Sequence, residues 1–271
     1  MKVDIGTVAS ITGSNSGIHL NSETFKRLEI SDIKEILNEK GFLLVKDMDW
    51  TLEDNITFCK KMGHLISNED RPKPLGQREG AVLSLSGSEK KEHVLTGRGA
   101  LPLHSDGLLV DTTVSTILLY CFDHDKNSGG ETFVSHQESA MKSAPSDILE
   151  ILEKNDLEYI AHETSYFTYA PEGWFPIPKT RHHNGKQGLF IGLPFKNHES
   201  KSWSVRIKNF SEEESNEILS RLDSHLRSEE YWYEHSWEEG DLLLVNNFKM
   251  LHGRNEFTGK RNVINLQVSH E

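Results

Sequence analysis

A histidine and an aspartate separated by one residue stand in the stretch Leu101-Pro102-Leu103-His104-Ser105-Asp106-Gly107. On a β-strand, side chains two residues apart point to the same face, so His104 and Asp106 are expected to reach one metal ion. A pair of this kind also arises by chance in a chain with 14 histidines, usually in a solvated loop. The pair alone therefore does not define a metal site.

A third candidate ligand, His252, lies far along the chain in the stretch from Asn247 to Arg254. Two histidines and one carboxylate form the facial triad, which leaves one side of Fe(II) open for a cosubstrate and O₂. The same donors also suit Zn(II), so a zinc hydrolase is one alternative. A non-catalytic β-sandwich that binds a metal or a sugar is another. Dependence of activity on O₂ and 2-oxoglutarate separates an oxygenase from a hydrolase.

The composition restricts the class of partner. A chain of 271 residues with 35% hydrophobic content can bury the core of one domain. Its formal net charge of −12 argues against nucleic acid, because phosphate binding needs a basic surface, and favours a small-molecule substrate. No membrane partner is expected, since no run of eighteen apolar residues occurs and Met1 to Gly6 lacks the apolar core of a signal peptide. Cys59 and Cys121 have no close cysteine neighbour, so we expect buried free thiols in the cytoplasm.

The amino-terminal part predicts helices outside an early strand. Residues 31–40 carry apolar side chains at helical spacing and end at Gly41, and residues 42–45 form an apolar run typical of a strand. Thr51 and Asp54 form a capping box that opens a second helix.

From about residue 81 the sequence predicts short strands separated by turns, with helical insertions. The predicted strands cover residues 81–85, 115–120, 131–134, 159–169, 188–193, 241–245 and 263–268, and the predicted helices cover residues 146–152 and 211–226. This pattern favours an all-β core with helical additions, a two-sheet sandwich of the jelly roll or double-stranded β-helix type. We expect a single domain over residues 1–271, with a lid or insertion around residues 140–235. In such a fold, early and late strands meet at one open end.

Four motifs between Leu101 and Arg261 resemble the Fe(II)/2-oxoglutarate dioxygenases related to taurine and 2,4-D dioxygenases. They are the His-x-Asp pair, the distal histidine, Gly129-Gly130-Glu131-Thr132 and Phe257-Thr258-Gly259-Lys260-Arg261. The resemblance implies Fe(II) bound by His104, Asp106 and His252. It also implies 2-oxoglutarate and O₂ as cosubstrates, with Thr132 contacting 2-oxoglutarate and Arg261 holding its distal carboxylate.

The roles of the arginines follow from simple electrostatics. The far carboxylate of the cosubstrate lies in a dry pocket, where an unpaired charge is costly, so a bidentate donor such as Arg261 is required. Arg254 is a competing clamp, but it lies two residues after His252 and is expected to orient neighbouring loops or contact substrate. Some family members carry a second arginine where this chain has Asn265, which leaves contacts to the near carboxylate open.

Residues 99–109 resemble the oxygenases of the PvcB type, which act beside isonitrile synthases. The resemblance implies desaturation of tyrosine isonitrile to a vinyl isonitrile, with hydrogen taken from the benzylic carbon and loss of the substrate carboxylate. The alternative is hydroxylation of another small carboxylated or amino-acid substrate. Retention of Asp106 argues against halogenation, because halogenating relatives replace this carboxylate.

A desaturase of this type needs a basic residue for the substrate carboxylate and a pocket for the aryl ring. The basic candidates are Lys91, Arg98 and Arg181. The aryl pocket is expected to draw on Tyr166, Phe167, Tyr169, Trp174 and Phe175, of which at least half are core or lid residues.

Overall fold

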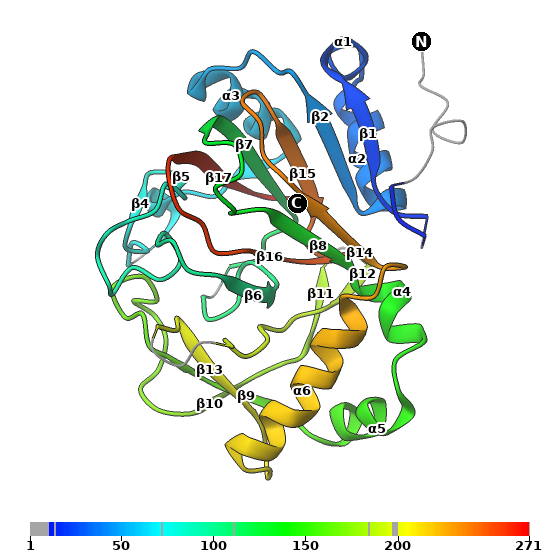
Figure 1. The fold of residues 1–271 in the computed structure, drawn as a ribbon, viewed down its shortest axis with the longest axis vertical. Coiled ribbons are helices and arrows are strands. Elements are labelled where there is room, and N and C mark those ends of the chain that lie inside the picture. Colours follow the sequence, from blue (N-terminus) through cyan, green and yellow to red (C-terminus); the bar gives the residue numbers. More distant parts are fainter. Residues whose placement is uncertain are drawn as a thin grey trace.

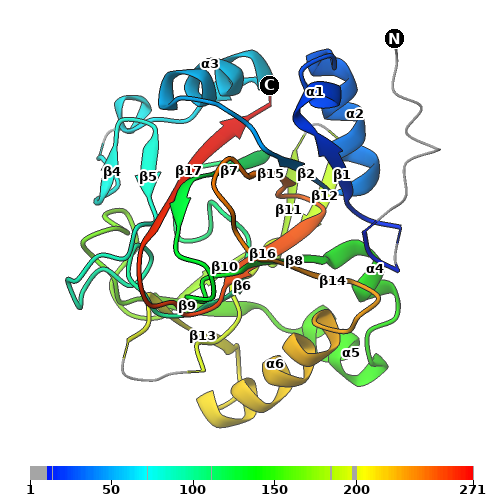
Figure 2. The ribbon, with the colours of Figure 1, turned by 45° about the horizontal axis from the view of Figure 1, so that its top comes forward.

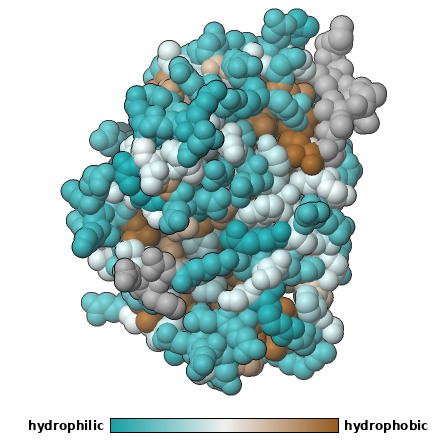
Figure 3. Space-filling view, viewed as in Figure 1, coloured by the Kyte–Doolittle hydropathy of each residue, from teal (hydrophilic) through white to brown (hydrophobic). Residues whose placement is uncertain are grey.

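The computed structural model describes residues 11–13, 15–71, 73–110, 112–183, 185–196 and 200–270. The segment from Met1 to Gly6, examined above for a signal peptide, lies outside these residues. Two β-sheets face each other at the centre, with helices on the outside (Figures 1 and 2). The face in Figure 3 is mostly hydrophilic, and Leu52 is the one exposed large hydrophobic residue in the described part of the chain. The apolar side chains therefore lie mainly inside.

The larger sheet has eight strands. Their order is β1 (Ile18–Asn21), β2 (Phe42–Lys46), β15 (Leu242–Asn246), β7 (Thr116–His124), β17 (Arg261–Ser269), β5 (Val82–Ser84) and β4 (Arg78–Glu79), and β3 (His64–Leu65) also pairs with β17. Three helices cover its outer face, α1 (Ser22–Phe25), α2 (Ile30–Lys40) and α3 (Leu52–Met62), as Figure 1 shows. Ile36 and Phe58 of these helices belong to one core cluster with Leu244 and Leu266 of the sheet. This packing leaves the other face of the sheet to the interior.

The smaller sheet has four strands in the order β14 (Trp232–His235), β8 (Thr132–His136), β16 (Met250–Arg254) and β6 (Leu101–His104). Along the chain, β6, β7 and β8 lie in the smaller, larger and smaller sheet, and β14, β15, β16 and β17 alternate in the same way. This alternation places strands that are distant in sequence next to each other, and β16 lies directly beside β6.

The chain between β8 and β14 forms a layer below the smaller sheet (Figure 1). It holds the three-stranded sheet β10-β9-β13 and the hairpin β11–β12. Its elements are α4 (Gln137–Lys142), α5 (Ser146–Lys154), β9 (Leu157–Ala161), β10 (Phe175–Ile177), β11 (Thr180–His183), β12 (Lys186–Leu189), β13 (Trp203–Ile207) and α6 (Glu212–Leu226). A short 3₁₀ helix, Asn68–Asp70, lies between β3 and β4.

The structure confirms the predicted helices and most of the predicted strands. The capping box predicted for α3 is present, with Asp54 N–H donating to Thr51 and the Asp54 carboxylate accepting from Thr51 N–H. Cys59 and Cys121 are buried free thiols, as expected. None of the helices in the described ranges is long and apolar enough to cross a membrane.

Two predicted strands are too long. The strand expected over 159–169 ends at Ala161, because the backbone turns at Glu163, whose carbonyl accepts from the N–H groups of Tyr166 and Phe167. The strand expected over 188–193 ends at Leu189, and Gly192 forms only an isolated bridge with His104. The segment 162–170 thus becomes available to line a cavity.

Candidate metal centre

His104, Asp106 and His252 converge at the end of the smaller sheet. His104 is the last residue of β6 and pairs directly with His252 of β16, and their ring centroids are 4.3 Å apart. Asp106 lies in the turn that follows, so it does not share a strand face with His104 as the sequence predicted. Gly107, with φ of +89°, permits this turn. The chain therefore turns back immediately after His104 and brings Asp106 to the same point.

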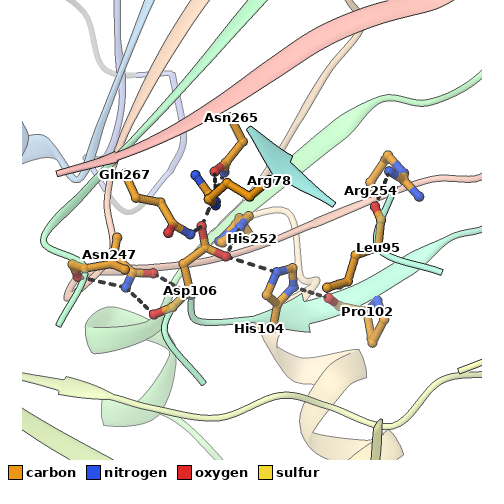
Figure 4. Close-up of polar contacts among 11 residues, drawn as sticks. Arg78, Leu95, Pro102, His104, Asp106, Asn247, His252, Arg254, Asn265 and Gln267 are labelled. Carbon is orange, nitrogen blue, oxygen red and sulfur yellow. Dashed lines mark hydrogen bonds and ion pairs between the residues drawn. The ribbon is translucent and has the colours of Figure 1, made fainter. Parts of the chain in front are cut away.

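The donor atoms are arranged around a shared position (Figure 4). Asp106 Oδ1 lies 3.5 Å from Nε2 of His104 and 3.5 Å from Nε2 of His252. One ligand atom from each residue lies within 4.8 Å of the others, and no other such group of three occurs in the described residues. The separations exceed an ordinary hydrogen bond, so these atoms fit a common cation better than they fit one another.

The other atoms of Asp106 are held from two sides. Its backbone N–H donates to Asn247 Oδ1 at 2.9 Å, while Asn247 Nδ2 donates to the Asp106 carbonyl at 2.9 Å. Its Oδ2 accepts from Gln267 Nε2 at 2.7 Å and from Asn265 Nδ2 at 3.3 Å. These contacts fix the carboxylate and leave Oδ1 directed at the histidines. Partners of this kind orient a metal ligand and tune its basicity.

The two histidines differ in whether their ring nitrogen Nδ1 has a hydrogen-bond partner. His104 Nδ1 lies 2.9 Å from the carbonyl oxygen of Pro102, which can only accept, so Nδ1 carries the proton and Nε2 presents a lone pair. Nδ1 of His252 has no partner among the described residues. The ring of His104 also packs against Trp203, with centroids 5.6 Å apart.

The electrostatics favour the metal-binding protonation states. Burial lowers the pKa of His252, and the neighbouring His104 lowers it further. Burial alone would raise the pKa of Asp106, but the imidazoles of His252 and His104 outweigh it and hold that pKa well below its usual value. A neutral imidazole and an ionised carboxylate are the forms that bind metals.

A cavity adjoins the three ligands, and Thr132 and Arg261 line it. Arg261 is only 2% exposed, and its Nη1 donates to the Leu85 carbonyl at 2.7 Å. Its Nε and Nη2 have no partner in the described part of the chain. Burial lowers the pKa of Arg261 to about 10, so it is still charged at neutral pH. A buried guanidinium with two unused donors fits an anionic ligand such as a carboxylate.

The hydroxyl of Thr132 is oriented by a tryptophan. Trp237 Nε1–H donates to Thr132 Oγ1 at 3.0 Å. Because the indole can only donate, the hydroxyl hydrogen of Thr132 is left available for an acceptor in the cavity.

Arg254, the other candidate for holding the distal carboxylate of 2-oxoglutarate, binds backbone carbonyls instead. Its Nη1 donates to the carbonyl of Leu95 at 3.1 Å, and its Nη2 donates to the carbonyls of Gly97 and Gly99 at 2.9 and 2.6 Å. These bonds hold the segment 95–99, whereas Arg261 keeps two donors free.

The residues suggested for substrate contact are dispersed. Tyr166 and Phe167 line the cavity beside the triad. Lys91 and Arg98 line a second, larger cavity beyond the segment 97–102. Arg181 donates to the Thr112 carbonyl at 2.6 Å and stacks on Phe190.

The remaining aromatic candidates also lie elsewhere. Tyr169 lines a separate cavity together with Arg71, and Trp174 stacks against Arg206. Phe175 lies in β10 and packs at the edge of the core. None of these three lines the cavity next to the triad.

Sequence reasoning did not find Asn247, Gln267, Trp203 or Trp237. One signal was present in β17, where Asn265 and Gln267 alternate with apolar residues. Alternation normally places polar residues in solvent. Here the helices cover the apolar side, so the polar side faces the cavity.

The sequence is similar to a known protein family and to enzymes of known activity. Residues 8–267 match the family described as taurine catabolism dioxygenase TauD, TfdA family. The 3-((Z)-2-isocyanoethenyl)-1H-indole synthase of Fischerella ambigua is 26% identical, over 80% of this chain and 75% of that protein. The tyrosine isonitrile desaturase of Pseudomonas aeruginosa is 28% identical, over 66% of this chain and 62% of that protein.

The fold also resembles solved structures. The crystal structure of PvcB from Pseudomonas aeruginosa has a TM-score of 0.69 and 21% identity, covering 93% of this chain and 86% of that one. Since this identity is low, the likeness establishes the fold and not the substrate. The family match spans nearly the whole chain and includes all three converging candidate ligands. The chain therefore belongs to the TauD/TfdA family, and it is a dioxygenase of the Fe(II)/2-oxoglutarate class.

Proposed function

We propose that this protein desaturates the isonitrile of an aromatic amino acid, with loss of the substrate carboxylate, and that tyrosine isonitrile is the substrate. The observation that carries the proposal is the cavity beside the triad, which combines the two free guanidinium donors of Arg261 with an apolar and aromatic lining. Both curated relatives described above have names that refer to isonitrile or isocyano compounds.

The ligand roles follow from the geometry. We assign Fe(II) to His104, Asp106 and His252, and 2-oxoglutarate to Arg261 and Thr132. Arg261 has two unused donors for the distal carboxylate, and Thr132 has a hydroxyl hydrogen for the same cosubstrate. When bound there, Fe(II) with 2-oxoglutarate and O₂ supplies the oxidant that removes hydrogen from the substrate.

The apolar part of the cavity lining determines which substrates fit. Leu95, Leu108, Tyr166, Phe167 and Trp203 line it. These side chains exclude water and offer an aryl ring flat surfaces and ring edges to pack against. An aromatic substrate is therefore favoured over a small aliphatic one such as taurine.

We also infer that the two facing sheets form a double-stranded β-helix, or jelly roll, because the strands from β6 to β17 alternate between them. The segment between β8 and β14 is then an insertion in a single domain, and Tyr166, Phe167 and Trp203 of this insertion reach the cavity. The fold thus supplies the metal ligands, and the insertion supplies much of the substrate wall.

The test is a product assay. The Fe(II) protein is incubated in air with tyrosine isonitrile and 2-oxoglutarate, and the products are separated by mass. The expected products are the vinyl isonitrile, succinate, two molecules of CO₂ and water, from one O₂. A hydroxylated product would overturn desaturation and favour the hydroxylase alternative. Absence of turnover, with turnover of another amino-acid derivative, would overturn the substrate.

The Arg261→Ala variant tests the cosubstrate assignment in the same assay. It is expected to raise the 2-oxoglutarate concentration needed for half-maximal rate about 100-fold, because a charged hydrogen-bond pair is worth about 3 kcal/mol. Normal 2-oxoglutarate dependence would contradict the assignment.

A further inference from the structure

Two arginines, Arg78 behind the wall of the triad cavity and Arg71 in the cavity that contains Tyr169, have guanidinium nitrogens without a partner among the described residues. Arg78 is 5% exposed, and its Nε has no partner; Arg71 is partly buried, and both its Nε and its Nη2 lack one among the described residues. A buried polar donor without a partner costs about 1–3 kcal/mol, and a charged one costs more. Three such atoms in two neighbouring side chains indicate a ligand that completes them.

The sheet directs Arg78 toward the cavity. Arg78 in β4 pairs with Leu83 in β5, Leu83 pairs with Asn265 in β17, and Asn265 pairs with Leu119 in β7. Residues directly opposite each other on adjacent strands have side chains on the same face. Leu83, Asn265 and Leu119 line the cavity, so the side chain of Arg78 lies on the cavity side of the sheet.

Arg78 reaches the cavity wall at Asn265. Its Nη2 donates to Asn265 Oδ1 at 3.2 Å (Figure 4). Its Nη1 donates to the Ala81 carbonyl at 2.6 Å. Asn265 in turn donates to Asp106 Oδ2. One asparagine thus separates this guanidinium from the candidate metal ligand. An anion at Arg78 would lie at the wall nearest the triad.

Arg71 extends the positive region. Burial lowers the pKa of Arg71, and the charge of Arg78 lowers it further, while Tyr166 acts in the opposite direction. The backbone brings the two arginines together, since Asn68 Nδ2 donates to the Arg78 carbonyl at 2.8 Å and the Asn68 carbonyl accepts from the Arg71 N–H at 3.3 Å. Arg71 lines the cavity that it shares with Tyr169. The neighbouring acid, Asp70, already accepts from Ser67 N–H at 2.8 Å and lies 3.2 Å from His64 Nε2.

The other cations at the cavity are already in use. Arg254 donates to three backbone carbonyls, and Arg261 is assigned to 2-oxoglutarate. Lys91 and Arg98 line the other cavity. Within the described residues, the guanidinium donors near the triad cavity that remain free, apart from Nε of Arg254, belong to Arg78 and Arg71.

We propose that Arg78, with Arg71 beside it, forms an anion subsite that receives the carboxylate of the substrate. The naming of that carboxylate as one from an isonitrile amino acid rests on the proposed function, whereas the subsite itself rests on the contacts above. Anchoring the carboxylate at Asn265 sets which carbon of the substrate faces the triad. Arg78 and Arg71 are thus specificity-determining residues rather than metal or cosubstrate ligands.

The test measures binding rather than turnover. The protein is loaded with Mn(II) and 2-oxoglutarate under anaerobic conditions and titrated by calorimetry with 3-(4-hydroxyphenyl)propanoate and with its methyl ester. The two probes differ in their negative charge and lack the isonitrile group. We expect the wild type to bind the acid at least about tenfold tighter than the ester, and Arg78→Gln to remove this preference while keeping the affinity for the ester.

Two further variants separate recognition from folding. Arg78→Lys keeps the charge and is expected to retain part of the preference, and Arg71→Gln, at a less buried position, is expected to reduce it. Arg221→Gln serves as the matched control, because Arg221 is half exposed and pairs with Asp147 far from the cavity. It should behave as the wild type. The affinity for 2-oxoglutarate, measured in separate titrations of the Mn(II) protein, should be unchanged in all four variants.

The outcomes are distinct. The subsite is overturned if the wild type binds acid and ester equally or binds neither, if the preference survives in Arg78→Gln and Arg71→Gln, or if Arg78→Gln weakens acid and ester alike. Failure of the product assay with an intact charge preference overturns the proposed function and supports the subsite. If the product assay gives the vinyl isonitrile but the titrations show no preference for the acid over the ester, the proposed function is supported and the subsite is overturned.

Discussion

Two buried clusters in this protein combine histidine with aspartate, and they serve different purposes. In the first, Asp106 Oδ1 faces His104 and His252 at 3.5 Å each. In the second, Asp241 Oδ2 lies 3.0 Å from His235 Nε2 and accepts from Lys46 Nζ at 2.8 Å. The residue types are similar, but the second cluster already contains a cation.

The backbone strengthens this difference. Asp241 Oδ2 also accepts from the N–H of Glu238 at 2.8 Å, so Lys46, His235 and the backbone all meet the same oxygen. At Asp106, the amides of Gln267 and Asn265 take Oδ2 and leave Oδ1 without a donor from the chain. The two clusters thus differ in what faces the carboxylate. Two imidazoles converge on Asp106 Oδ1 without a protein cation, whereas at Asp241 the ammonium of Lys46 already occupies the corresponding place, and Asp241 Oδ1 has no partner in the described residues.

Replacing Asp106 should give the largest effect. Asp106→Ala removes one of three ligands, so the affinity for Fe(II) or Mn(II) is expected to fall more than the 10–100-fold typical of losing a supporting partner, and turnover should disappear. Metal content after anaerobic loading and desalting gives the first measurement. Thermal unfolding in the presence of a chelator should be close to that of the wild type. A variant that retains stoichiometric metal would show that the three side chains are not the ligand set.

Replacing Asp241 should lower the stability of the fold and leave metal binding unchanged. Asp241→Asn leaves Lys46 and His235 without their charged partner, and we expect about 3 kcal/mol less stability, near the lower end for broken buried pairs because Glu238 still lies 3.0 Å from Lys46. Urea unfolding in chelator measures the loss. Metal content per folded molecule should not change. A loss of metal with unchanged stability would reverse the roles of the two clusters.

The same variant has a pH signature. Burial would raise the pKa of Asp241, but His235 and Lys46 lower it below its usual value. A carboxyl group whose pKa is lower in the folded state stabilises the protein above its unfolded pKa, and that stability is lost as the pH falls through the folded pKa. Between neutral pH and this acidic range, Asp241→Asn should therefore show a shallower loss of stability than the wild type. If the stability of the variant and that of the wild type fell equally with pH, Asp241 would not be the source of this pH dependence.

A smaller effect is expected from replacing Gln267, which holds the other oxygen of Asp106, Oδ2. Gln267→Leu removes the 2.7 Å hydrogen bond to Asp106 Oδ2, and metal affinity should fall about 10- to 100-fold. Asn262→Leu is the matched control, because Asn262 lies on the same strand but is exposed. Its metal affinity should equal that of the wild type. Equal losses in the two variants would mean that the strand, and not the hydrogen bond, controls the site.

The convergence of His104, Asp106 and His252 could be predicted from the sequence because their residue types suit a shared metal ion, even though Asp106 proved to lie in a turn and not on a strand. The helices were predictable for a local reason, since caps and apolar spacing lie within a few residues. Asn247 and Gln267 could not be predicted, because their bonds to Asp106 join residues more than 140 positions apart. The assignments of Lys91, Arg98 and Arg181 stay predictions that the cavity lining does not favour. A basic residue near a motif says little about the direction of its side chain, whereas the strand pairing of Arg78 does.

The direct pairing of His104 with His252 makes the metal centre a check on strand alignment. The two imidazoles meet because β6 and β16 are aligned at this one pair. A slip of β16 by one residue would present Leu251 or Gly253 opposite His104 and turn the imidazole to the other face of the sheet. A misaligned sheet would then bind no iron. Metal uptake during refolding would therefore report the moment at which the first and last parts of the β core find their correct alignment.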